Sequence, residues 1–149
     1  MIHKLIKTTD DIIPAVARIV AGFVILPHGL QKTIGLFGGH GFSGTMGFFT
    51  HTMGIPAPLA FLAIMAESAG ALGLIVGLLS RVAAFGVASN MTVALFLSLP
   101  NGFFMNWSSN QKGEGIEYHL LMLCLTLIVM IRGGGAFSLD RKISQAGDP

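Results

Sequence analysis

Two ionisable residues lie inside long apolar stretches of the sequence, Arg18 in the first stretch and Glu67 in the second. Charged groups are costly within a membrane, so they commonly pair or serve a site. A helix rises ~1.5 Å per residue, which places Arg18 ~9 Å inside one membrane edge and Glu67 ~15 Å inside the other. The depths differ by only ~6 Å, so the two can pair, as a structural strut or as the floor of a polar pocket.

Four more polar residues lie near the far end of these stretches. His28 and Lys32 end the first apolar segment, and Glu117 and His119 begin the last. Together with Glu67 they can face one outward-opening cavity. We therefore expect Glu67 and His28 to exchange protons as catalytic residues. The candidate substrate-binding residues are Arg18, Lys32, Glu117 and His119.

Each of these residues also has a simpler interpretation. His28 can be a hydrogen-bonded histidine at the membrane interface, and Lys32 and Glu117 can be ordinary interface residues. Asn90, in the third apolar segment, is expected to donate a hydrogen bond to a neighbouring helix.

The composition indicates that these residues are carried by membrane helices. Of the 149 residues, 52% are hydrophobic and 11% are charged, against roughly a quarter charged in soluble domains. The length suits about four spans of ~20 residues. Four apolar segments predict helices over about 12–31, 57–79, 82–100 and 116–132, with outer loops 32–56 and 101–115. The predicted fold is therefore all-α, a single domain over 1–149 forming a four-helix transmembrane bundle.

Two helix faces stand out within this bundle. At 100° per residue one stripe of the first helix carries Arg18, Gly22, Ile25, Gly29 and Lys32. On the second helix Gly70, Gly73 and Gly77 are spaced for close helix approach, which favours packing within the bundle or a homo-oligomer.

The distribution of lysine and arginine predicts the orientation. One set of loops and ends carries six of them and the other carries Lys32 and Lys112. The basic side of a membrane protein faces the cytoplasm, so both termini are expected there, in a bacterial inner membrane. The first apolar run is longer than a signal peptide's and is followed by no small-residue cleavage site, so we expect it to be retained. The six basic residues are Lys4, Lys7, Arg81, Arg132, Arg141 and Lys142.

Several function classes are disfavoured. One cysteine, Cys124, allows no internal disulfide or redox pair. The histidines and cysteine lack the spacing of a metal site, and a net charge of +2 does not indicate nucleic-acid binding. The segment GGGAFSLD follows a helix and not a strand, so it is no phosphate loop. We expect Ser138 to Asp140 to pack under the bundle.

Over residues 18–140 the sequence resembles the DoxX family of small four-helix bacterial membrane proteins. The resemblance implies a quinone-linked redox role, because one branch of the family is a membrane subunit of an archaeal thiosulfate:quinone oxidoreductase system. Another branch resembles accessory proteins of redox and stress-resistance complexes. The positions that carry the resemblance are Arg18, His28, Gly29, Lys32, Glu67, Gly77, Arg81, Glu117, Gly135, Ser138, Leu139 and Asp140.

Two main hypotheses follow. In the first, the chain is a redox-system subunit whose polar pocket binds quinone, with a redox protein as partner. In the second, it is a non-catalytic membrane scaffold or partner protein in which Glu67 only specifies packing. A transporter of a small solute is a weaker alternative, because four helices need a second copy to form a path.

Overall fold

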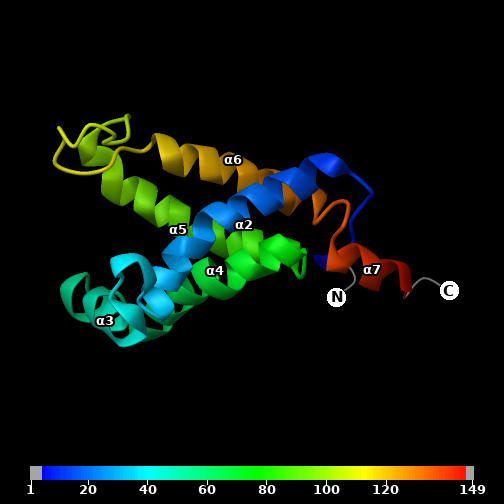
Figure 1. Cartoon of the computed structure of the whole chain (residues 1–149), viewed down its shortest axis with the longest axis horizontal. Helices are drawn as coiled ribbons and strands as arrows, with labels where there is room; N and C mark the ends of the chain where they lie inside the picture. The colour runs from blue at the N-terminus through cyan, green and yellow to red at the C-terminus, as the bar shows by residue number, and fades with distance from the viewer. Residues whose placement is uncertain (1–4, 147–149) are drawn as a thin grey trace.

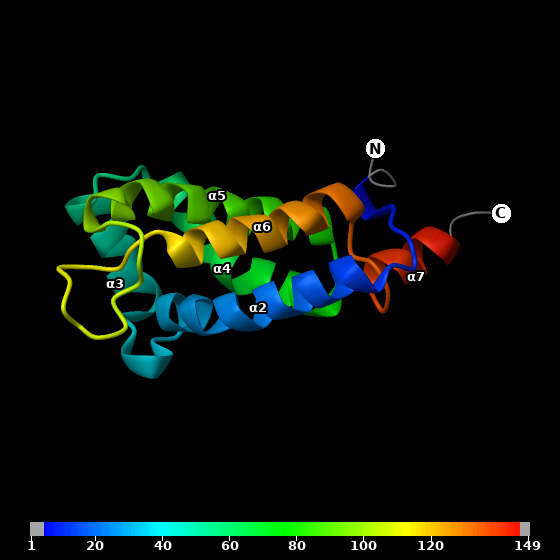
Figure 2. The same cartoon turned by 90° about the horizontal axis from the view of Figure 1, so that it is seen from above.

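The computed structural model describes residues 5–146, and this part of the chain is helical and contains no strand. This confirms the all-α class. Four long helices lie alongside one another (Figures 1 and 2). They are α2 (Ile12–Thr33), α4 (Ala57–Val76), α5 (Ser80–Ser98) and α6 (Glu117–Arg132). Lys4, which contributed to the predicted orientation, lies outside the described residues.

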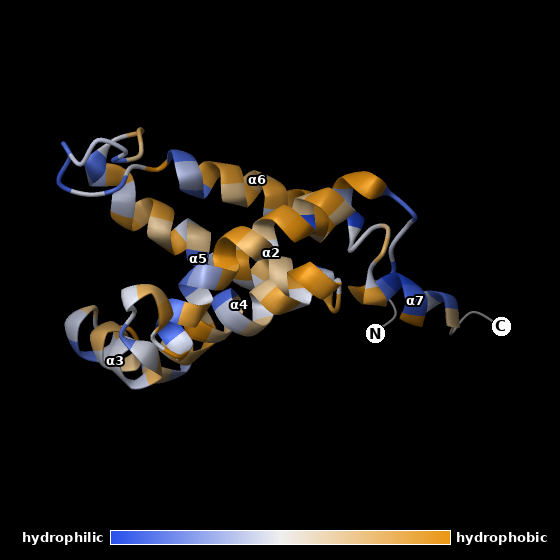
Figure 3. Cartoon of the chain, viewed as in Figure 1, coloured by the Kyte–Doolittle hydropathy of each residue, from blue (hydrophilic) through white to orange (hydrophobic). Residues whose placement is uncertain are grey.

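Three of the long helices are long and apolar enough to cross a membrane. They are α2, α4, and α5 with the short helix η3 (Leu99–Asn101) that continues it. Their exposed residues are largely apolar, and Figure 3 shows hydrophobic residues along much of their length. The fourth helix, α6, has 16 residues and packs against α5 and α2.

Small residues on α2 let it approach α4 closely. A side chain at Gly22 would come within 2.7 Å of Ile75, and one at Gly29 would overlap the backbone carbonyl of Glu67. Alanines at the same level complete the apolar core with Ile25, Leu74 and Val87. The predicted approach through the glycines of α4 is wrong in part. Gly77 ends α4 in the left-handed region, at φ 72°, while Gly70 and Gly73 have more space around them.

At the end of the bundle near both termini, polar side chains tie the helix ends together. The carboxylate of Asp140 accepts hydrogen bonds from the backbone N–H groups of Leu79 and Ser80, at 2.7 and 2.8 Å. The Asp140 N–H in turn donates to the carbonyl of Gly77. The short helix α7 (Leu139–Ala146) is thereby fixed against the turn between α4 and α5. Ser138 and Asp140 pack under the bundle as predicted, whereas Leu139 between them is exposed.

The opposite end is built from two connections. Between α2 and α4 the chain forms a 3-10 turn, η1 (Leu36–Gly38), then α3 (Gly41–Gly47) and a π-helical turn, η2 (Phe48–Thr52). Between η3 and α6 it forms an irregular loop. Both connections lie at the end of the bundle away from the termini (Figure 1).

Candidate functional site

Arg18 does not pair with Glu67, so this prediction is wrong. The Arg18 side chain is 1% exposed and donates hydrogen bonds to backbone carbonyls only. Two of these carbonyls belong to the last turn of α4, where helix geometry leaves carbonyls without partners. The guanidinium therefore caps a helix end, and we do not include it in the candidate site. Its acceptors are the carbonyls of Leu74, Ile75, Gly134 and Ala136.

Glu67 instead pairs with Lys32. The Lys32 ammonium donates to Oε2 of Glu67, while the Asn90 amide donates to Oε1 at 3.2 Å. Asn90 also donates to the carbonyl of Ala63 at 2.7 Å, which confirms its predicted role as an interhelical donor. Glu67 is 7% exposed. Three helices, α2, α4 and α5, thus contribute one polar cluster, which we call the Lys32 cluster.

The packing of α2 on α4 explains why Lys32 and not Arg18 reaches the acid. Gly29 lies directly on the backbone of Glu67, and Lys32 is three residues further along α2, on nearly the same face. Arg18 is eleven residues from Gly29 in the other direction, which is ~16 Å along the helix. An arginine side chain cannot span that distance. The estimated membrane depths of Arg18 and Glu67 were therefore not enough to predict which residues pair.

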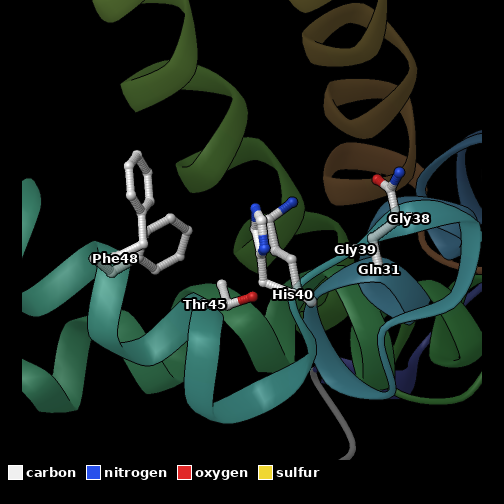
Figure 4. A pocket seen from close by; sticks show the side chains of 8 residues that line it. Gln31, Gly38, Gly39, His40, Thr45 and Phe48 are labelled. Carbon is white, nitrogen blue, oxygen red and sulfur yellow. The ribbon is translucent and has the colours of Figure 1, made fainter.

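A pocket of about 310 Å³ adjoins Lys32 at the end of the bundle away from the termini. Its floor comes from the end of α2, and its walls come from η1, α3 and η2. In Figure 4, His40 and Thr45 lie between Phe48 on one side and Gln31 on the other. Nitrogen-bearing and aromatic side chains therefore face a common space. The lining residues are Gln31, Lys32, Gly38, Gly39, His40, Thr45, Phe48 and Phe49.

The turn that presents Phe48 and Phe49 is unusual. Residues Phe48–Thr52 form a π-helical turn, and single π turns are frequent at functional sites. Opposite this turn, Gly39 lies so close to the backbone of Gln31 that any side chain there would overlap it. The loop is therefore held against the end of α2. Gln31 adds a hydrogen bond of 3.2 Å to the carbonyl of Phe37.

His28 lies beside Tyr118, a residue that the sequence analysis did not select. Their ring centroids are 6.4 Å apart, and the Tyr118 ring also lies 5.7 Å from that of His119. The Tyr118 hydroxyl is buried and has no hydrogen-bond partner among the described residues. The only available signal was its position next to His119 in the predicted start of the last helix.

Of the five polar residues expected to face one cavity, Lys32 lines the pocket described above, and the shared cavity stays a prediction. The Glu117 carboxylate accepts a hydrogen bond from the backbone N–H of Met105 at 3.1 Å, which ties down the loop before α6. Glu117 lines a separate, mostly apolar groove. His119 is 8% exposed at the first turn of α6. Only Lys32 and Glu67 are brought into direct contact.

These features define a small helical membrane protein with a charged cluster inside its bundle. A family model described as DoxX matches residues 13–99, which is more than half of the chain. The chain belongs to the DoxX family. It is also 28% identical, over 144 residues, to a protein named inner membrane protein YqjF of Escherichia coli strain K12. That alignment covers 93% of this chain and 98% of the relative. No solved structure matches the chain significantly.

Proposed function

We propose that α6 crosses the membrane together with α2, α4 and α5, and that both termini lie in the cytoplasm of a bacterium. Two observations support this topology. First, α6 packs against two candidate spans. Second, outside the spans the end near the termini carries five basic residues among those described, while the other end carries only Lys32 and Lys112. Basic residues favour the cytoplasmic side.

Labelling of introduced cysteines tests the topology. In a Cys124→Ser background, Ser109→Cys should react in spheroplasts with a maleimide that cannot cross the membrane. Gln145→Cys should react only after lysis. Reaction of both in intact spheroplasts, or of Gln145→Cys alone, would contradict the proposed four spans or their orientation.

We propose further that the chain is the membrane subunit of a redox system and binds the head group of a quinone beside the Lys32 cluster. The observation that carries this proposal is the Lys32–Glu67 pair, whose lysine lines a pocket with aromatic walls. Quinone carbonyls accept hydrogen bonds, which Lys32 and His40 can donate. The rings of Phe48 and Phe49 offer apolar surfaces for a planar head group.

In this proposal each charged residue has a defined task. Lys32 donates to a carbonyl oxygen of the quinone, and Glu67 holds the Lys32 side chain in place. Glu67 also offers a buried carboxylate that takes up or releases a proton when the head group changes oxidation state. The electrons come from a redox partner protein. His28, on the same helix as Lys32, is the proposed route by which protons reach Glu67.

Binding of decylubiquinone to the purified full chain tests this function. We expect saturable binding to the wild type in mild detergent, measured by equilibrium dialysis. Glu67→Gln should weaken binding by about tenfold, because a charge-assisted hydrogen bond to Lys32 contributes roughly 1.5–3 kcal/mol. Glu114→Gln is the matched control, since it makes the same change at an exposed loop residue. Absence of saturable binding to the wild type would overturn the proposal.

A non-catalytic scaffold is the second candidate. The observation that favours it is that Lys32 and Asn90 already engage both oxygens of Glu67, as a purely structural tie would. In that case Glu67→Gln lowers thermal stability or assembly with a partner, and the wild type binds no quinone. A small-solute transporter remains a weaker third candidate, and it requires that solute flux into vesicles depend on the chain.

A further inference from the structure

Helix α7 presents an apolar stripe that no part of the described chain covers. Phe137, just before the helix, is 79% exposed, and Leu139 and Ile143 are 39% and 48% exposed. Leu139 and Ile143 are four residues apart, so they lie on one face of the helix. An adjoining face of the helix is anchored to the protein, because Asp140 is 1% exposed and caps α5. The helix is therefore amphipathic, with its polar anchor turned toward the protein.

The anchor also fixes the level of α7 relative to the membrane. Asp140 binds the first residues of α5 and the last glycine of α4, where two candidate membrane spans meet. Phe137 and Leu139 therefore lie at the level where apolar spans end. In both views α7 projects from this end of the bundle, away from α4 (Figures 1 and 2). At ~1.5 Å per residue its later residues extend outward by up to ~10 Å, a distance similar to the thickness of the headgroup layer.

Basic side chains lie at that outer level. Arg141 and Lys142 follow Leu139 on α7, and Arg132 ends α6 with its side chain exposed. Arg141 also pairs with the exposed Asp10 at 2.7 Å, a surface ion pair. The acidic residues that face this region are Asp10 and Asp11, since Asp140 is buried. The surface thus combines exposed apolar groups at the end of the spans with three basic and two acidic side chains, an excess of one positive charge.

The backbone of Phe137 gives an independent indication that this arrangement is maintained. The backbone of Phe137 has φ 57°, in the left-handed region that residues other than glycine rarely adopt. The tight turn GGGAFSLD would accept glycine at this position. Instead, the turn holds a large aromatic residue in a strained backbone conformation with its side chain largely exposed.

We propose that Phe137 and α7 form a binding surface for anionic phospholipid of the adjacent leaflet. Phe137 and Leu139 insert at the edge of the hydrocarbon layer, Ile143 lies among the lipid headgroups, and Arg141 and Lys142 bind lipid phosphates. This surface does not depend on quinone binding, since it lies at the opposite end of the bundle from the Lys32 cluster.

Native mass spectrometry of the full chain with phosphatidylglycerol or phosphatidylcholine tests the proposal. The wild type should retain phosphatidylglycerol preferentially. Arg141→Gln with Lys142→Gln should reduce that preference by roughly fivefold for each charge, since a basic residue near an anionic surface contributes ~1 kcal/mol. Asp10→Asn is the matched control, because it breaks the same ion pair and leaves the charges of α7 in place. Lys112→Gln controls for net charge at the other end.

Phe137→Gly separates lipid contact from folding. Glycine suits the left-handed backbone, so the thermal stability in detergent should stay the same or rise while lipid retention falls. In a Cys124→Ser background, a fluorescent label on Ile143→Cys should shift to the blue in phosphatidylglycerol vesicles.

Three results would overturn the proposal. The first is equal retention of the two lipids by the wild type. The second is a loss in Asp10→Asn or Lys112→Gln as large as that in the double variant. The third is a label at residue 143 that remains in water or cross-links to a second copy, which would make this face an interface between copies.

Discussion

The two ends of α2 carry charged residues on one stripe, but the structure uses them differently. Arg18, near the termini, is bound only by backbone carbonyls and is 1% exposed. Lys32, at the other end, is bound by a side chain and borders a pocket. A charge that caps helix ends has no capacity left for a ligand. A charge held by another side chain beside a pocket can exchange partners. This difference is why we assign Arg18 to the scaffold and Lys32 to the candidate site.

Replacement of Arg18 should produce the largest effect. Arg18→Met removes the donor for four carbonyls and should lower the free energy of unfolding in detergent by about 3–5 kcal/mol, because buried polar groups lose their partners. Thermal unfolding monitored by circular dichroism measures this. Arg18→Lys should restore only part of the loss, because an ammonium lacks the fork of the guanidinium. A stability within ~0.5 kcal/mol of the wild type would contradict the scaffold role.

Breaking the Lys32–Glu67 pair should have a smaller effect that can be compensated. Lys32→Met leaves Glu67 buried without its cation and should lower stability by about 2 kcal/mol, since the pair is only partly exposed. The double variant Lys32→Met with Glu67→Gln should recover at least half of this, a coupling of about 1 kcal/mol or more. Additive losses in the same unfolding measurement would show that the pair is not coupled.

Asp140 should matter less than Arg18, although it is equally buried. Asp140→Ala removes the acceptor for the backbone N–H groups of Leu79 and Ser80, and helix caps contribute about 1–2 kcal/mol. Asp140→Asn retains one acceptor oxygen and should lose roughly half as much. Chemical unfolding in mixed micelles compares the two. Quinone binding should be unchanged in both variants. Weakened binding in Asp140→Asn would contradict the view that the two ends of the bundle act independently.

The smallest stability effect is expected at Tyr118. Its hydroxyl has no partner in the described chain, so Tyr118→Phe should change stability by less than ~0.5 kcal/mol. If the hydroxyl serves the ligand near Glu67, decylubiquinone binding should weaken several-fold in dialysis. A clear loss of stability would show instead that the hydroxyl has a structural partner.

The predicted helices and their polar stripe came from local patterns. Hydrophobic runs predict α2, α4 and α5 because a span must be apolar over a fixed length. The stripe through Arg18, Gly22 and Gly29 follows from helical periodicity, and all three residues are buried. The predicted Arg18–Glu67 pair is wrong because pairing depends on the position of one helix along the axis of its neighbour. Gly29 decides this by resting on Glu67, and no single-helix pattern contains that information.

The sequence by itself determined that this is an all-helical chain of membrane character, with costly charges inside its helices and a basic excess near its termini. Those properties follow from composition and periodicity, which act locally. The tertiary structure decided which partner each charge receives, because partners come from other helices. It assigned Arg18 to carbonyls at a helix end and Lys32 to Glu67. In the tertiary structure Glu117 contacts the loop before α6, and α7 has an uncovered apolar face.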